Sequence, residues 1–338
     1  MEKKKVTIED VARSLGIAKS TVSKALSDAT DISPEMREKV LRCASALGYQ
    51  IRRRQPAQNG CVAVFVAGIE YESVDLFGHE VLLGFQSEAS SARIGMQVVP
   101  VAEEENFDER YCELSGQSGF LGSFFLGFRP ARSFAKTFER IGRPAVLLDK
   151  DYDSVLTAHI GTDNTIGMSE AVAHLAALGH HRIGFLGGER ELSITMERKE
   201  AFDAALRQYG MDLDAPVAFA GFHRDYDPAL VLQLVDEGAT ALICCSDLIA
   251  LAAMKKLSAA GISVPQQVSV IGYDGIPLAG YATPGLTTIA QNSLQMGKIA
   301  LRMLRDLSDG VQISRVLLRP KLIVRESTAA VSTAGEME

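Results

Sequence analysis

The stretch VTIEDVARSLGIAKSTVSKAL, residues 6–26, predicts two short helices joined by a tight turn. Thr7 is a favourable N-cap for the first helix, and Asp10 stands three residues later, where a capping box places its acid. The first helix has one apolar face at the i, i+3, i+4 spacing of helix packing, made of Ile8, Val11 and Ala12. Leu15-Gly16-Ile17 supplies the turn, so the second helix follows directly.

The second helix has an apolar face and a polar face. Its apolar residues are Val22, Ala25 and Leu26, and its outward-facing polar residues are Lys19, Ser20, Ser23 and Lys24. A helix-turn-helix reads DNA by laying such a second helix in the major groove. The alternative is a two-helix hairpin at the surface of a helical bundle, with the same polar face solvated.

Residues 7–26 closely resemble the N-terminal headpiece of the LacI family of bacterial transcription regulators. The family pattern runs roughly T-x-x-D-V-A-x-x-x-G-V-S-x-x-T-V-S-R, and the match has no gaps. Ala18 stands where the family usually has a capping Ser, and Lys24 where it often has Arg. The resemblance implies DNA contacts for Thr7, Lys19, Ser20, Thr21, Ser23 and Lys24. We expect Lys19, Ser20 and Lys24 to read bases.

A third helix is expected to begin at the Ser33 cap and Pro34 and to end near Leu47. It closes the expected headpiece core with four residues: Met36, Val40, Ala44 and Leu47. We therefore interpret residues 1–49 as a DNA-binding headpiece and residues 50–60 as a linker.

The linker departs from the family pattern. LacI-family members usually show Tyr-x-Pro-Asn-x-x-Ala-Arg-x-Leu here, a segment that forms a hinge helix on the operator. This chain keeps Tyr49 but has Ile51 in place of the Pro, and no Leu precedes Cys61. Three arginines are expected to contact phosphates or a narrow minor groove instead: Arg52, Arg53 and Arg54. The alternative is a solvated basic linker.

Charge separates the two ends of the chain. Residues 1–56 contain twelve Lys and Arg against seven Asp and Glu, a net charge of +5, so the rest of this −7 chain carries −12. A basic head on an acidic body favours phosphate binding. The sequence has no transmembrane run and no apolar signal region, and its five cysteines lack metal-ligand spacing. We expect a cytoplasmic protein with reduced thiols and no metal.

From Cys61 onward, short apolar runs alternate with helix-length amphipathic segments. Strands are predicted at residues 62–66, 97–101, 121–126, 145–148, 183–186, 217–220, 241–245 and 268–271, with helices such as 168–178, 197–209 and 248–260 between them. This alternation predicts an α/β fold with doubly wound parallel sheets. The family resemblance extends here, through segments such as GHHRI at 179–183 and VSVIGYD at 268–274. It implies a periplasmic-binding-protein-like core of two subdomains.

In that architecture the chain crosses between the subdomains three times, here near residues 160, 290 and 321. The core is then expected at 61–330, with an N-subdomain at about 61–159 and 291–321, a C-subdomain at about 160–290 and 322–330, and a tail at 331–338. The end of the chain after Glu326 lacks a leucine heptad, so we expect a homodimer rather than a tetramer.

Ligands of such folds bind at the carboxyl ends of the strands. By motif, six residues match the family's effector contacts: Asp149, Arg198, Phe222, Ser246, Asp274 and Gln291. Paired Asp and Arg groups suit vicinal hydroxyls or a carboxylate, and an aromatic ring stacks on the apolar face of a sugar. Ser246 departs from the family's common Asn. The alternatives are structural, since a strand-end Asp can cap a helix and Phe222 can belong to the core.

The sequence therefore predicts a sequence-specific DNA-binding regulator, expected to be a repressor, controlled by a small ligand such as a sugar or sugar acid. Its expected partners are double-stranded operator DNA, that effector and a second copy, with no membrane and no cofactor. An enzyme is disfavoured because Walker A, G-x-S-x-G and H-E-x-x-H motifs are missing, as is a G-x-G-x-x-G after the first strand. A stand-alone binding module with a vestigial headpiece remains the alternative.

Overall fold

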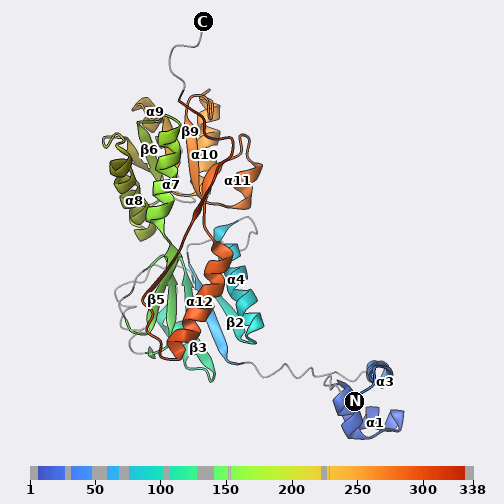
Figure 1. The fold of residues 1–338 in the computed structure, drawn as a ribbon. Coiled ribbons are helices and arrows are strands. Elements are labelled where there is room, and N and C mark those ends of the chain that lie inside the picture. Colours follow the sequence, from blue (N-terminus) through green and yellow to red (C-terminus); the bar gives the residue numbers. More distant parts are fainter. Residues whose placement is uncertain are drawn as a thin grey trace. The chain divides into compact units, whose positions relative to one another are not determined.

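The computed structural model describes residues 7–26, 32–47, 59–67, 76–101, 107–127, 141–150, 152, 154–221, 227 and 229–331. The chain divides into two compact units, Met1–Gln58 and Asn59–Glu338, which are described separately (Figure 1). No helix in these described ranges is long and apolar enough to span a membrane.

The first unit contains three helices: α1 (Ile8–Leu15), α2 (Lys19–Leu26) and α3 (Pro34–Ala46). The Thr7 backbone N–H donates to the Asp10 carboxylate at 2.9 Å, the reach-back bond of a capping box. Gly16 ends α1 in the left-handed region at φ 64°, where glycine carries no steric penalty. The core is formed by Val11, Ala12, Val22, Ala25, Val40 and Ala44, which confirms these members of the predicted apolar faces. The predicted residues Ile8 and Met36 are partly buried against this core, and the side chain of Leu26 lies outside the described residues.

The prediction for Leu47 is wrong. Leu47 lies one residue beyond the end of α3 at Ala46, and its side chain is 39% exposed. The helical spacing that brings Val40 and Ala44 into the core therefore stops before it reaches Leu47. The Ser33 hydroxyl accepts the Met36 N–H at 3.3 Å, so the start of α3 is as predicted.

The second unit contains two six-stranded sheets. The first has the order β11-β5-β4-β3-β1-β2 and its strand pairs are parallel. Its strands are β1 (Cys61–Val66), β2 (Gly95–Pro100), β3 (Phe120–Leu126), β4 (Ala145–Leu148), β5 (Thr157–Thr162) and β11 (Arg315–Leu318). The described helices of this subdomain are α4 (Phe77–Ser91), α5 (Phe107–Ser115) and α12 (Ser293–Ser308).

The second sheet has the order β12-β10-β9-β8-β6-β7, with only β12 antiparallel to its neighbour among these pairs. Its strands are β6 (Ile183–Gly187), β7 (Val217–Phe219), β8 (Ala241–Cys244), β9 (Ser269–Asp274), β10 (Thr287–Ala290) and β12 (Lys321–Ile323). Its described helices are α7 (Asn164–Ala177), α8 (Ser193–Tyr209), α9 (Leu230–Asp236), α10 (Asp247–Ala259) and α11 (Pro277–Tyr281).

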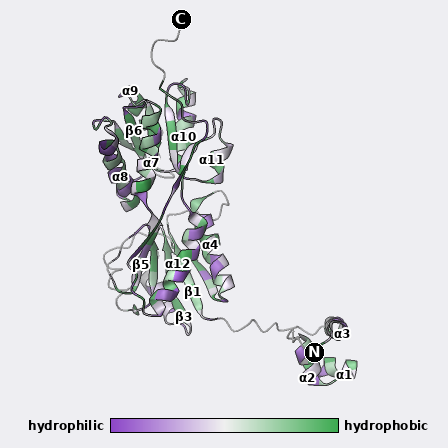
Figure 2. Cartoon of the chain, in the orientation of Figure 1, coloured by the Kyte–Doolittle hydropathy of each residue, from purple (hydrophilic) through white to green (hydrophobic). Residues whose placement is uncertain are grey.

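The two sheets confirm the predicted α/β fold with two parallel-sheet subdomains. The central strands are buried and hydrophobic, as the colouring of β1 and β3 in Figure 2 shows. Four strands were not predicted: β5, β10, β11 and β12. Thr157–Thr162 is buried throughout but rich in polar and small residues, while the last two strands are short and partly exposed, so none carries a strong apolar signal.

The chain passes between the sheets at three places. It leaves the first sheet after β5 and enters the second subdomain through α7, returns between β10 and α12, and leaves again between β11 and β12. Gln291, in the segment between β10 and α12, binds both Thr162 at the end of β5 and Asp274 at the end of β9. The carboxyl end of β5 therefore lies next to the carboxyl ends of the second sheet.

Two glycines let α4 and α12 touch through their backbones. A Cβ added at Gly84 would lie 2.0 Å from the Leu294 carbonyl oxygen, and one at Gly297 would lie 1.9 Å from the Val81 carbonyl oxygen. The two helices lie side by side against the first sheet (Figure 1). This close approach fixes α12, the helix that follows the second crossing.

Candidate functional site

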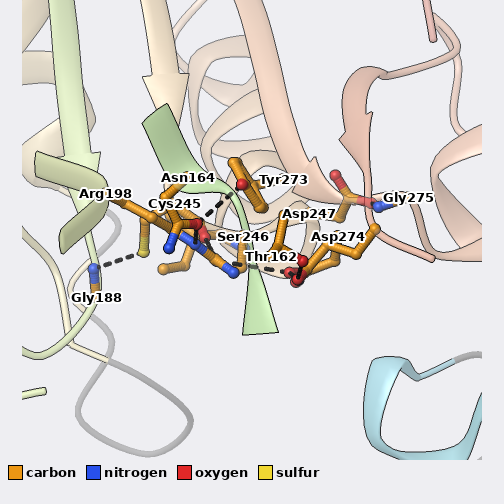
Figure 3. A network of polar contacts seen from close by, with 12 residues as sticks. Thr162, Asn164, Gly188, Arg198, Cys245, Ser246, Asp247, Tyr273, Asp274 and Gly275 are labelled. Carbon is orange, nitrogen blue, oxygen red and sulfur yellow. Dashed lines mark hydrogen bonds and ion pairs between the residues drawn. The ribbon is translucent and has the colours of Figure 1, made fainter. Parts of the chain in front are cut away.

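A buried ion pair forms at the carboxyl ends of the second sheet. Asp274 is the last residue of β9, and Arg198 comes from the first half of α8. An Arg198 guanidinium nitrogen lies 3.5 Å from the Asp274 carboxylate, with side-chain exposures of 7% and 15% (Figure 3). Each group compensates the other's charge in a buried setting, so each residue holds its partner in place.

Arg198 is fixed from several sides. Its Nε donates to Asn164 Oδ1 at 3.3 Å, its Nη1 donates to the Cys245 carbonyl at 2.5 Å, and its guanidinium lies 3.9 Å from the centre of the Tyr273 ring. The Tyr273 hydroxyl in turn donates to Asn164 Oδ1 at 2.9 Å. Burial has the largest single effect and lowers the pKa of Arg198, but Asp274, Tyr273, Asp149 and Cys245 together outweigh it, so the pKa is raised and this cation stays charged.

Gln291 connects this pair to the segments that cross between the sheets. Its Nε2 donates to Asp274 Oδ1 at 2.7 Å, and its Oε1 accepts the Thr162 hydroxyl at 2.5 Å. Burial raises the pKa of Asp274 to about 6, while Arg198 and the Gln291 hydrogen bond oppose that rise. Asp274 is therefore largely ionised at neutral pH and keeps acceptor capacity for a ligand.

Asp149 approaches from the first sheet, just after β4. Its backbone lies in the left-handed region at φ 52°, and its side chain faces Gly161 of β5. A Cβ at Gly161 would lie 2.7 Å from both Asp149 Oδ1 and His159 Nε2, so the missing side chain makes room for both. Burial raises the pKa of Asp149 to about 7, with Arg198 opposing the rise. Asp149 therefore changes its charge near neutral pH.

The remaining two effector contacts predicted from the sequence are Ser246 and Phe222. Ser246 is the N-cap of α10: its hydroxyl accepts the Ile249 N–H at 3.2 Å, and the residue is 7% exposed. It still has a proton to donate. Phe222 lies outside the described residues.

The candidate DNA-reading residues lie on α2. Lys19, Ser20 and Lys24 are exposed and Thr21 is partly buried, whereas the side chain of Ser23 and the whole of Arg52, Arg53 and Arg54 lie outside the described residues. Lys19 forms an exposed ion pair with Glu9 of α1 at 2.5 Å, which the sequence did not predict. The Lys19 hydrogen bond lowers the pKa of Glu9. Because the pair is exposed and easily screened, it holds Lys19 only weakly.

Known proteins match both units of the chain. Residues 7–51 match the family described as bacterial regulatory proteins, lacI family, and residues 172–328 match a periplasmic binding protein-like domain. The HTH-type transcriptional repressor CytR of Escherichia coli K12 is 30% identical over 336 residues, which cover 96% of this chain and 97% of that protein. The chain belongs to the LacI family. It is a DNA-binding transcription regulator with a periplasmic-binding-protein-like core, and not an enzyme.

Solved structures of other regulators share the fold of this LacI-family chain. The transcriptional regulator CelR–cellobiose complex matches with a TM-score of 0.70 and 27% identity, over 96% of this chain and all of that one. The Lac repressor bound to ONPG in the repressed state matches with a TM-score of 0.73 and 25% identity, with the same coverage.

Sequence reasoning missed several members of this LacI-family site. Asn164, Tyr273 and the Cys245 carbonyl hold Arg198, and His159 and Gly161 surround Asp149. Tyr273 immediately precedes Asp274 in the VSVIGYD segment, so its place beside the site could have been inferred from the sequence. Asn164 and His159 lie on or beside β5, a strand that the sequence did not predict, so no pattern pointed to them.

Proposed function

We propose that this LacI-family regulator is a repressor whose operator affinity is set by a sugar or sugar derivative bound at Asp149, Arg198 and Asp274. The observation that carries the proposal is the buried Arg198–Asp274 pair at the strand ends, with Asp149 approaching from the other subdomain. Two relatives support it: CytR is named as a repressor, and CelR was solved with cellobiose.

The chemistry of these groups suits hydroxyl-rich ligands. Two carboxylates accept hydrogen bonds from neighbouring hydroxyls, and a guanidinium donates to ring or hydroxyl oxygens in a fixed fork. Such charge-assisted bonds are about twice as strong as neutral ones. Phe222 is proposed to stack on the apolar face of the sugar, and Ser246 and Gln291 to complete the set of polar contacts.

Binding at these groups is proposed to change the relation between the two subdomains. Gln291 contacts Asp274 in one subdomain and Thr162 at the end of the first sheet, so a ligand that engages Asp274 acts directly beside two crossings. We propose that this alters the subdomain angle, and with it the spacing of two headpieces on DNA. Coupling of this kind is typically worth about 1–3 kcal/mol per ligand.

A homodimer is the proposed form, because helix-turn-helix proteins commonly bind two half-sites as dimers. Its proposed interface includes three exposed apolar residues of the second subdomain: Leu248 at 42%, Leu278 at 42% and Tyr281 at 83%. Asp247 binds the backbone of Ile276, so the segments that carry Leu248 and Leu278 are neighbours. Tyr281→Asp should shift sedimentation toward the monomer. Val155→Asp, at a residue of the first subdomain that is 72% exposed, should leave it unchanged.

We also propose the domain boundaries given above and direct base contacts for Lys19, Ser20 and Lys24, with the protein acting on DNA in the cytoplasm. The linker arginines are proposed to contact phosphate. Replacing Arg52, Arg53 and Arg54 together by Gln should flatten the slope of log affinity against log salt by roughly one to three units. An unchanged slope would mean that the linker is only a solvated spacer.

The deciding experiment combines operator selection with a ligand screen on the full chain. Binding selection from random duplexes first gives the operator, and sugars are then tested for their effect on operator affinity. Asp274→Ala should bind the operator like the wild type but lose the ligand response. A normal response in Asp274→Ala would place the ligand elsewhere, and an absence of operator binding would leave only a binding module.

A further inference from the structure

Asp247 is a fully buried carboxylate that lies beside the proposed effector contacts. It is the first residue of α10 and has no exposed surface. Oδ2 accepts the backbone N–H groups of Gly275 and Ile276, both at 2.8 Å, and Oδ1 accepts the Thr288 hydroxyl at 2.5 Å. One buried side chain therefore binds the turn after β9 and the neighbouring strand β10.

That turn has an unusual backbone. Asp274 has φ 119° and Gly275 has φ 76°, two consecutive residues in the region that favours glycine. A non-glycine residue in this region is strained and persists only where its surroundings hold it. The two N–H groups bound by Asp247 belong to the residues that immediately follow Asp274, so the carboxylate holds the backbone that sets the direction of the Asp274 side chain.

The two carboxyl groups also affect each other electrostatically. The backbone N–H of Asp247 is among the groups that lower the pKa of Asp274, and Asp274 raises the pKa of Asp247.

The space around Asp247 allows little movement. A Cβ added at Gly272 would lie 2.1 Å from Asp247 Oδ1, so only glycine leaves room for the carboxylate at this position of β9. Burial and then Asp274 raise the pKa of Asp247 to about 8. Either protonation state satisfies the contacts, because a protonated Oδ1 donates to the Thr288 hydroxyl while Oδ2 still accepts both N–H groups.

We propose that Asp247 is a positioning residue of the effector site, which holds the Asp274–Gly275 turn so that Asp274 faces Arg198 and the ligand. The inference rests on the proposed role of Asp274 in effector binding. Asp247 itself has no surface to offer a ligand, so it acts only through Asp274.

Hydrogen–deuterium exchange of the full chain tests the holding role without any ligand. Asp247→Leu has a similar volume but no acceptor, so the Gly275 and Ile276 amides should exchange about tenfold to a hundredfold faster than in the wild type. Asp247→Asn keeps one oxygen for both amides and an amide group for Thr288. It should therefore restore protection to within about threefold of the wild type.

Ser269→Ala is the matched control, because Ser269 is as fully buried as Asp247. It lies at the start of β9, the end opposite Asp274, where it binds His180. The control substitution should leave exchange at Gly275 and Ile276 unchanged. A wild-type exchange rate in Asp247→Leu would overturn the proposal, because the carboxylate would then not hold the turn. Equally fast exchange in Asp247→Leu, Asp247→Asn and Ser269→Ala would also overturn it, because the turn would then respond only to a general loss of stability.

A thermal-shift arm with cellobiose, ribose and ONPG separates this inference from the proposed function. One of these sugars is expected to raise the midpoint of thermal unfolding of the wild type. With that sugar, Asp247→Leu and Asp274→Ala should show no rise in the midpoint, and Asp247→Asn should show the wild-type rise. An unchanged rise in Asp274→Ala, or no rise with any of the three in the wild type, counts against the proposed function alone, because the exchange result still decides whether Asp247 holds the turn. A rise lost in Asp274→Ala but kept in Asp247→Leu would overturn the positioning role.

Discussion

Arg198→Ala should abolish the effector response while leaving operator binding intact. The substitution removes the cation 3.5 Å from the Asp274 carboxylate, two further hydrogen bonds and the contact with the Tyr273 ring. Loss of one partner of a buried, hydrogen-bonded charge pair costs about 2–5 kcal/mol of binding energy. At about 1.4 kcal/mol per factor of ten, that is roughly a 30-fold to 4000-fold loss of effector affinity.

The stability cost should be smaller than this binding loss. Arg198 is the main group that lowers the pKa of Asp274, so its removal lets Asp274 take up a proton instead of keeping an unpaired charge. Calorimetric titration of the sugar that shifts the wild type measures the affinity, and gel shifts measure operator binding. Arg198→Lys keeps the charge without the planar fork, so its effector affinity should fall between those of the wild type and Arg198→Ala. Wild-type affinity in Arg198→Ala would refute the reasoning.

Three more outcomes are expected. Lys24→Ala should relax base preference at one operator position by about 1–3 kcal/mol in binding selection, whereas uniform weakening would indicate a phosphate contact. Gly297→Ala should lower the free energy of unfolding by about 1–3 kcal/mol or more, because its Cβ meets the Val81 backbone. Gly116→Ala, whose Cβ comes no closer than 3.4 Å, is its mild control in denaturant titrations. Effector affinity should rise as the pH increases through about 7, because Asp149 then ionises, and Asp149→Asn should remove this step; a flat wild-type profile would contradict it.

The same carboxylate has the opposite effect on stability. The pKa of Asp149 is raised in the folded state above its ordinary value of 3.8, so between about pH 4 and 7 the folded protein binds more protons than the unfolded chain. Its contribution to the free energy of unfolding therefore falls as the pH rises through this window. Effector affinity and this part of the unfolding free energy should change in opposite directions with pH, and Asp149→Asn should remove the share of each change that Asp149 contributes, while Asp274 and Asp247 keep theirs.

The fold was predictable wherever the sequence carries a strong periodic signal. The apolar spacing of Val11 and Ala12 and the turn at Gly16 predicted the first two helices, and continuous apolar runs predicted the central strands. Thr157–Thr162 gave no such signal, because its burial comes from neighbouring strands on both sides rather than from its own hydrophobicity. Contacts with neighbouring strands, rather than local sequence, therefore determine that residues 157–162 form a strand. They also determine where the crossing to the second subdomain begins.

For the candidate site, local motifs predicted single residues but not their supports. Asp274 could be picked out because it ends a recognisable strand, and Arg198 because it matches a family motif, although α8 begins at Ser193 and Arg198 lies within its first half. The groups that hold them come from distant parts of the chain: Asn164 lies 34 residues from Arg198, and Asp247 lies 28 residues before Gly275. Their hydrogen bonds depend on strand order, which no local pattern of residues specifies.

The placement of Gln291 explains how such a site can report on a ligand. Its amide is shared between Asp274, which the ligand is proposed to engage, and Thr162, the last residue of β5. A ligand hydroxyl that takes over the Asp274 oxygen must compete with the Gln291 donor. The released amide then has to find a new partner at the junction of two crossings. A change of one hydrogen bond at this point is worth about 0.5–1.5 kcal/mol, which overlaps the lower end of the about 1–3 kcal/mol typical of allosteric coupling. In the proposed mechanism the subdomains need no large movement of the pocket itself to sense the ligand, because Gln291 binds both Asp274 and Thr162, at the end of the strand that leads into a crossing.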